Sequence, residues 1–180
     1  MAEARARTDE LFAIVRPEAM YERPISERHR IIFYVGHLEA FDWNLLADRA
    51  FGLKPFQPAF DQLFSFGIDP VDGGLPTDTP ADWPALEEVL AYTQKIRDKI
   101  DQAIDEALSR AGGGEQQLKN LLEVAIEHRL MHAETLAYML HRLPAEKKIG
   151  ERIVRKPAKA RVKSQLIEIP AGRATLGLVM

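Results

Sequence analysis

The stretch LKNLLEVAIEHRLMHAETLAYML, residues 118–140, decides the fold, because its apolar side chains recur at the three- and four-residue spacing of an α-helix. The apolar members of this stripe are Leu118, Leu121, Leu122, Ala125, Leu136 and Met139. Two histidines, His128 and His132, occupy the remaining positions of the stripe. Residues four apart lie above one another on one face of a helix, so the two imidazoles can converge. The pattern predicts a helix over about residues 115–142 with a histidine pair on its buried face.

The histidine pair indicates a metal site, with core packing as the alternative. Two adjacent buried imidazoles cannot both become charged without a large cost in free energy, and a shared cation would satisfy both. Alternatively, each is a core histidine bonded to a neighbouring helix. The zinc-protease motif H-E-x-x-H does not match, because Arg129 stands where that motif has its glutamate base. Arg129 in this position therefore argues against a zinc protease.

A third ligand must come from another helix, since two ligands are too few for a protein metal site. The chain contains no cysteine, which leaves histidine, aspartate and glutamate. His37 lies in IIFYVGHLEAFDWNLL, residues 31–46, and shares a helical face with Phe33, Phe41 and Asn44. Gly36 precedes it, and a glycine inside a helix costs about 1 kcal/mol relative to alanine, so we expect another group to approach the backbone there. We predict His37 as the third ligand.

Other polar residues are expected to take no part in metal binding. His29, in the charged run SERHR, and His141, beside Arg142, are expected to be solvated. Glu127 and Glu134 cannot share the histidine face, because residues one or two apart on a helix point in different directions. We expect three further residues to have capping, surface or packing roles: Asn44, Tyr92 and Tyr138.

Four helical segments are predicted, over about residues 3–15, 25–50, 84–109 and 115–142. A long connection, residues 51–83, joins the second and third segments without regular structure of its own. Its five phenylalanines indicate that it packs over one end of the bundle, near His37. The sequence thus predicts an all-α four-helix bundle with a long crossover, residues 1–146, followed by a basic linker and a short irregular tail, residues 147–180.

Composition narrows the partners. With 180 residues, 46% of them hydrophobic, the chain can bury one sizeable core. The net charge is −3, and basic residues cluster only near the C-terminus, so we expect no nucleic-acid partner. No signal peptide or apolar run of about 18 residues is present, so we expect a cytoplasmic protein with no membrane partner. Apolar residues of the tail would need cover from the bundle or from another chain, which leaves a dimer open.

The segments GHLEAFDWNLL, residues 36–46, and EHRLMHAETLAYML, residues 127–140, together resemble the DinB-like four-helix metal-binding domain. The form they resemble is the N-terminal domain of the ergothioneine-biosynthesis sulfoxide synthases. Supporting similarity runs through FDQLFSFGIDPVDGGLP, residues 60–76, and EEVLAYTQKI, residues 87–96, so it covers most of residues 8–143. The resemblance implies that His37, His128 and His132 hold a non-heme iron.

A second resemblance concerns IEIPAGRATLGL, residues 167–178, which is similar to the start of the formylglycine-generating-enzyme/sulfatase-modifying-factor domain. We therefore expect residues 147–180 to hold a basic linker and the beginning of a second domain that is incomplete in this chain. The family implies Fe(II)- and oxygen-dependent formation of a C–S bond between a small-molecule thiol and a histidine derivative. Zinc or nickel could occupy the site on isolation, because both bind nitrogen ligands more tightly than Fe(II) does. One departure leaves the thiol open: DPVDGGLPTDTPADWP, residues 69–84, stands where this family carries an arginine-rich segment.

Two other functions remain as alternatives. The first is a stand-alone DinB-like transferase in which zinc or nickel activates a thiol by lowering its pKa. The second is a helical interaction module without catalysis, whose histidines only pack. Metal content separates this last function from the other two.

Overall fold

The computed structural model describes residues 1–47, 49–68, 74–109, 115–150, 166–168 and 170–173. Five α-helices follow one another along the chain: α1 (Ala2–Phe12), α2 (Ile31–Leu46), α3 (Pro58–Phe66), α4 (Leu86–Ser109) and α5 (Glu115–Arg142). Three short 3₁₀ helices accompany them: η1 (Pro17–Ala19), η2 (Pro80–Asp82) and η3 (Ala145–Lys147). Within these ranges the chain forms no strand, and its one β-bridge joins Val15 to Lys148. The all-α prediction is confirmed.

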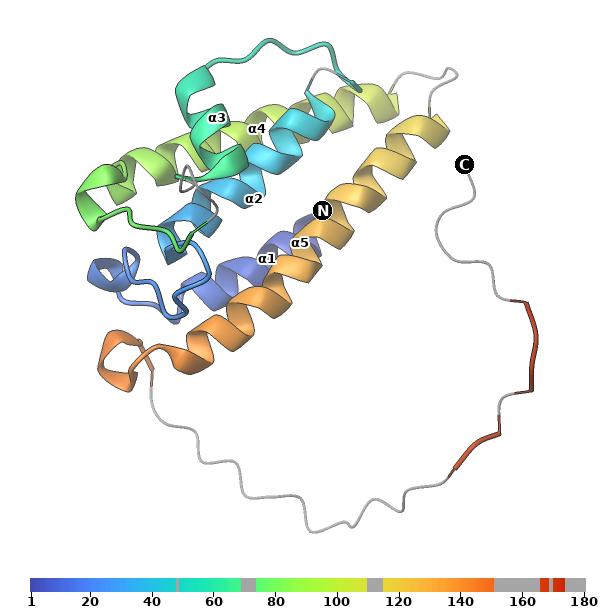
Figure 1. Ribbon diagram of the computed structural model, residues 1–180. Coiled ribbons are helices and arrows are strands. Elements are labelled where there is room, and N and C mark those ends of the chain that lie inside the picture. The colour runs from blue at the N-terminus through green and yellow to red at the C-terminus, as the bar shows by residue number, and fades with distance from the viewer. Residues whose placement is uncertain (48, 69–73, 110–114, 151–165, 169, 174–180) are drawn as a thin grey trace. The chain divides into compact units, whose positions relative to one another are not determined.

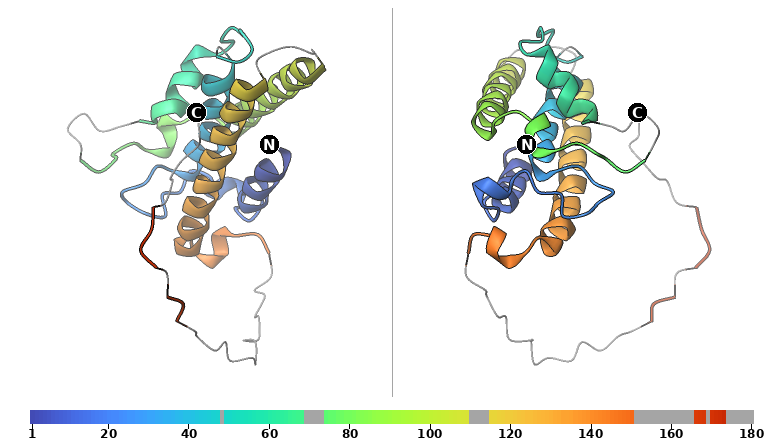
Figure 2. Two further views of the ribbon diagram at one scale, coloured as in Figure 1. Left: turned by 90° about the vertical axis from the view of Figure 1, so that its right-hand side faces the viewer. Right: turned by 60° about the vertical axis from the view of Figure 1, so that its left-hand side comes forward.

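Helix α2 is the central element of the bundle. It packs against α4 on one side and α5 on the other, and α1 packs on α5 (Figure 1). The short helix α3 lies against α2, as two further views of the bundle show (Figure 2). Because neighbours cover α2 on several sides, most of its residues are buried, including Ile31, Leu38 and Leu46. His37 is therefore carried by the best-covered helix of the domain.

The long helices lie close to their predicted ranges. Helix α5 has the predicted bounds, and α4 starts two residues after the predicted position 84. The prediction for α2 began too early, at residue 25 instead of Ile31. Before Ile31 the chain folds back on itself: the Ile31 amide donates to the Glu22 carbonyl at 3.0 Å, and the Ile32 amide donates to the Met20 carbonyl at 2.7 Å. These bonds replace the helical ones that the sequence pattern led us to expect.

The connection after α2 contains a helix of its own, so the prediction of an irregular segment was wrong. Helix α3 begins at Pro58, whose fixed φ suits a first helical turn, and ends before Gly67, whose φ is +75°. The expected aromatic packing is confirmed for four phenylalanines, which join the core or pack against it: Phe51, Phe56, Phe60 and Phe64. Phe66 is the exception and is 69% exposed.

The later part of the connection is tied down through Asp78, whose carboxylate is fully buried. It accepts hydrogen bonds from Trp83 Nε1 at 2.7 Å and Arg30 Nε at 2.9 Å, and it pairs with Arg23. Burial alone would raise the pKa of Asp78, but the bonds from Trp83 and Arg30 and the charges of both arginines together lower it. The connection is thereby fastened to the segment between α1 and α2.

The chain divides into a unit of residues Met1–Ile149 and a unit of residues Gly150–Met180. The first unit extends past α5, because the Arg16 amide donates to the Lys147 carbonyl and the Ile149 amide donates to the Ile14 carbonyl. Most of the basic run 147–163 and half of the segment 167–178 lie outside the described residues. The boundary at residue 146, the second domain and the cytoplasmic location stay predictions. None of the described helices has the length and apolar character needed to span a membrane.

Candidate metal centre

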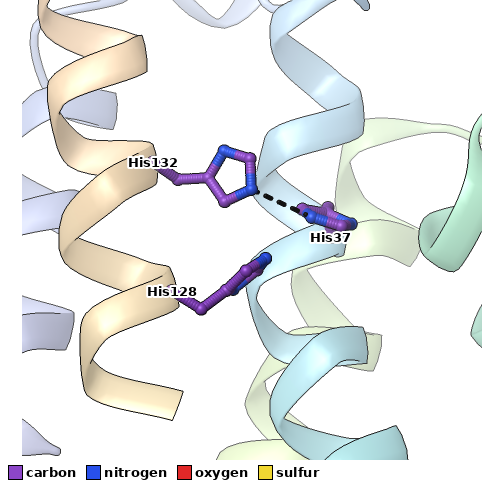
Figure 3. A group of neighbouring side chains, drawn as sticks. All are labelled: His37, His128 and His132. Atoms are coloured by element: carbon purple, nitrogen blue, oxygen red, sulfur yellow. Dashed lines mark hydrogen bonds between the residues drawn. The ribbon is translucent and has the colours of Figure 1, made fainter. Parts of the chain in front are cut away.

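The three histidines selected from the sequence come together between α2 and α5. His128 and His132 project from successive turns of α5, and His37 faces them from α2 (Figure 3). One ring nitrogen from each residue lies within 4.8 Å of the other two. The Nε2 atoms of His37 and His132 are only 3.1 Å apart. All three side chains are half-buried. The arrangement brings three nitrogen donors from two rigid helices to one point.

Aromatic rings hold the imidazoles in place. Phe41, one turn after His37 on α2, stacks on His128 with ring centroids 3.5 Å apart and planes 10° from parallel. Phe33, one turn before His37, stacks on that histidine at 4.7 Å. Such contacts restrict the rotation of both imidazoles and shield one side of each from water. The phenylalanine spacing of four residues that marked this face in the sequence thus frames the histidines.

Burial keeps the three histidines neutral. It lowers the pKa of His128 to about 3, and the charges of His132 and His37 act in the same direction. The pKa of His132 is lowered to about 4, again mainly by burial and then by the charge of His37. Burial also lowers the pKa of His37. Neutral imidazole is the form that binds metal ions, so these histidines would not need to lose a proton near pH 7 in order to bind one.

Gly36 explains how α3 reaches His37. A Cβ atom built on Gly36 would lie 2.3 Å from Cδ1 of the Phe64 ring, which is far inside the normal contact distance. The glycine therefore lets the Phe64 ring sit directly on the backbone of α2, and the Phe64 side chain is fully buried there. In this position the Phe64 carbonyl is 2.7 Å from His37 Nδ1. The close approach that Gly36 led us to expect is confirmed.

Residues 1–136 match the sequence model of a known family, the DinB superfamily. The chain belongs to the DinB superfamily. It is 31% identical over 176 residues to ergothioneine biosynthesis protein 1 of Neurospora crassa, an alignment that covers 89% of this chain and 19% of that protein. It is 26% identical over 136 residues to ergothioneine biosynthesis protein 1 of Schizosaccharomyces pombe, covering 70% of this chain and 17% of that protein. The chain thus spans about a fifth of the length of these curated relatives.

A buried ionic network adjoins the histidines of this DinB domain, and sequence reasoning missed it. Arg129, next to His128 on α5, is 0% exposed. Its Nη2 atom lies 2.7 Å from Asp42 Oδ2 and 3.0 Å from Glu39 Oε2, both on α2. Burial raises the pKa of Asp42 to about 6, although the charge of Arg129 opposes this. Arg129, in the position where zinc proteases have their base, here pairs α5 with α2.

The same network reaches the other two helices through Glu39. Arg97 on α4 lies 2.7 Å from Glu39 Oε1 and makes two hydrogen bonds with Asp9 on α1, at 2.7 and 2.8 Å. Arg5 on α1 donates to both carboxylate oxygens of Asp101 on α4. The available sequence signal was a pair of acidic residues, Glu39 and Asp42, one turn apart in an otherwise apolar helix.

The remaining sequence predictions have mixed outcomes. Asn44 donates to Ser65 Oγ at 2.6 Å, so it has the structural role we expected. The side chains of Glu127, Glu134 and His141 are exposed, as predicted. The prediction for His29 was wrong: its ring is half-buried, stacks on Phe33 with centroids 4.1 Å apart, and lies against Gly67. The charged residues of SERHR led us to expect a solvated ring, but the chain folds back here and brings the ring against Phe33 and Gly67.

Tyr92 and Tyr138, for which we expected packing or surface roles, differ in environment. Tyr92 is buried in α4 and donates a hydrogen bond to Asp61 Oδ1 at 2.7 Å, which together with burial raises its pKa. Tyr138 is partly exposed on α5, with the guanidinium of Arg28 5.7 Å from its ring centroid. The packing role expected for Tyr92 is confirmed.

Proposed function

We propose that His37, His128 and His132 bind one divalent metal ion, and that this ion is Fe(II) in the working protein. The observation that supports this most directly is the convergence of three neutral imidazoles from two helices within 4.8 Å. Two nitrogens that each lie about 2.1 Å from one ion, at roughly a right angle to each other, are about 3 Å apart. The 3.1 Å between Nε2 of His37 and of His132 fits that requirement. Imidazole suits iron, zinc and nickel alike, so the donors do not by themselves select the metal.

We further propose that the chain is the metal-binding part of a sulfoxide-synthase-like enzyme that joins a small-molecule thiol to a histidine derivative. When bound, Fe(II) would supply coordination positions for a thiolate and for oxygen, together with the redox chemistry of C–S bond formation. The support is the resemblance of residues 36–46 and 127–140 to such domains and the two relatives named for ergothioneine biosynthesis. Because those relatives are about five times longer, the full activity is assigned to the longer protein.

The residues of this chain have defined tasks in that proposal. His37, His128 and His132 hold the ion with neutral nitrogens, so binding requires no proton release near pH 7. The stacked rings of Phe41 and Phe33 orient two of the imidazoles and keep water from one side of each. Helices supply more precise positions than loops do, and all three ligands lie on helices.

Metal analysis of the purified chain tests the proposal. We expect about one Fe(II) per chain after anaerobic loading, and loss of binding in His128→Ala and in His132→Ala, because two remaining ligands hold an ion poorly. The matched control is His141→Ala, which removes an exposed histidine from the last turn of the same helix. Zinc or nickel in the protein as purified is compatible with an iron role, because both bind nitrogen ligands more tightly than Fe(II) does. A wild-type chain that binds none of the three ions would refute the proposal.

A further inference from the structure

The C-terminal turn of α3 contacts His37 at the nitrogen that faces away from the other histidines. The last carbonyl groups of a helix lack partners within the helix. Helix α3 ends at Phe66, and the Leu63 carbonyl accepts a hydrogen bond from the Gly67 amide at 2.7 Å. The next carbonyl, that of Phe64, lies 2.7 Å from His37 Nδ1. A carbonyl oxygen can only accept, so Nδ1 must carry the proton in this contact.

We propose that the end of α3 is a positioning device that fixes the tautomer of His37, and that Gly36 and Phe64 are the residues on which it depends. With the proton on Nδ1, the lone pair of Nε2 is directed at His132, whose own Nε2 is 3.1 Å away. The other tautomer would place a proton on the atom that has to bind the ion. The negative end of the α3 dipole at Phe66 further favours a donor at this position.

Three contacts hold α3 where this bond can form. Tyr92 on α4 donates to Asp61 at 2.7 Å, and Asn44 on α2 donates to Ser65 at 2.6 Å, on the residue that follows Phe64. The third contact is the Phe64 ring against Gly36. That ring also packs against Tyr92, with centroids 5.8 Å apart, so it has little room to move aside. Any side chain at position 36 would therefore push α3 away from His37.

The first test uses nuclear magnetic resonance of the metal-free, ¹⁵N-labelled chain, in which long-range proton–nitrogen correlations report the protonated nitrogen of each imidazole. We expect His37 to carry its proton on Nδ1 in the wild-type chain. In Gly36→Ala the His37 signal should change to the Nε2-protonated form or to a mixture of both. Gly74→Ala is the matched control, because a Cβ atom at Gly74 meets no atom within 4 Å. It should leave the His37 signal unchanged.

A rescue variant separates positioning from general damage to the fold. In Gly36→Ala/Phe64→Ala the ring atoms that would lie 2.3–2.5 Å from the added Cβ are gone, while the backbone carbonyl of residue 64 stays. We expect this double variant to regain the Nδ1-protonated form. The readout is local to one imidazole, so a purely structural loss of stability would not reproduce it.

The second test measures Zn(II) binding, and this part rests on the proposed metal site. We expect Gly36→Ala to raise the Kd for Zn(II) about 10- to 100-fold, as is usual when a partner of a metal-binding histidine is lost. The double variant should recover most of that affinity. The proposal is overturned if wild-type His37 is protonated on Nε2, or if folded Gly36→Ala keeps both its tautomer and its Kd. If the wild-type chain binds no metal yet shows the expected tautomers, the positioning role of α3 stands and the proposed function fails.

Discussion

Replacing Arg129 by methionine tests the buried network at its centre. Methionine keeps an unbranched chain of similar length but leaves Asp42 and Glu39 without the guanidinium that contacts them at 2.7 and 3.0 Å. All three side chains are at most 1% exposed, so water cannot replace the lost partner. Removing one member of such a buried pair costs about 3–5 kcal/mol of folding free energy. For a chain of this size, that corresponds to a fall in Tm of roughly 6–20 °C.

The loss should also depend on pH. The pKa of Asp42 is already raised to about 6 by burial, against the opposing charge of Arg129, and removing that charge raises it further. A carboxyl group whose pKa is higher in the folded state holds more protons there than in the unfolded state. Stability therefore falls as pH rises from 3.8 through the folded value, and protonation restores it at lower pH. The difference between Arg129→Met and wild type should thus be largest near pH 8 and shrink toward pH 5.

Urea unfolding followed by circular dichroism at pH 8 and pH 5 measures both effects. Arg142→Met is the matched control, since Arg142 is exposed at the end of the same helix, and it should change stability by no more than about 0.5 kcal/mol. Adding Asp42→Leu to Arg129→Met removes the carboxylate that loses its arginine, since Glu39 keeps Arg97 at 2.7 Å, and should recover part of the loss at pH 8. A loss below about 1 kcal/mol at pH 8, or an equal loss at both pH values, would refute the reasoning.

Three further predictions follow from the connections around the bundle. Truncation after Ile149 should leave Tm unchanged. Truncation after Glu146 should lower the free energy of unfolding in urea by about 1–3 kcal/mol, because it removes the hydrogen bonds Arg16–Lys147 and Ile149–Ile14. Equal stability of the two truncated chains would contradict this. Asp78→Asn should lower stability by about 1–3 kcal/mol at pH 7. Since the pKa of Asp78 is lowered from 3.8, this deficit should narrow as pH falls below 3.8, and a constant deficit would count against the ion pairs. Chymotrypsin should spare the bonds after Phe60 and Phe64, and rapid cleavage there in the native chain would show that α3 does not pack.

The sequence predicted best those helices in which the apolar spacing repeats over many turns. Helix α5 repeats its apolar spacing over many turns, so its bounds could be read directly from residues 115–142. Helix α3 has only nine residues, and its amphipathic pattern is too short to separate from a phenylalanine-rich loop. The start of α2 depends on backbone bonds from Ile31 and Ile32 to the preceding segment, which no local pattern reveals.

The histidine cluster could be predicted from the sequence for a similar reason. The spacing of His128 and His132 fixes their common face, and the Phe33–His37–Phe41 repeat identified the facing helix. The ionic network was missed because Arg129 pairs with residues about 90 positions earlier in the chain. In three dimensions Arg129 and its partner Asp42 are both fully buried beside the candidate metal site.

The histidine cluster and the ionic network use adjacent faces of the same two helices. On α5, His128 turns toward the candidate metal site while its neighbour Arg129 turns into the network, and on α2 the same division separates Phe41 from Asp42. The bonds of Arg129 therefore fix the rotation of α5 one residue away from His128, a candidate ligand. Because α2 and α5 are held together by these bonds and by the core, the three imidazoles do not need an ion to bring them together. The candidate site thus needs no ion to assemble, unlike small zinc domains that fold only with their metal, and we expect the metal-free chain to stay folded.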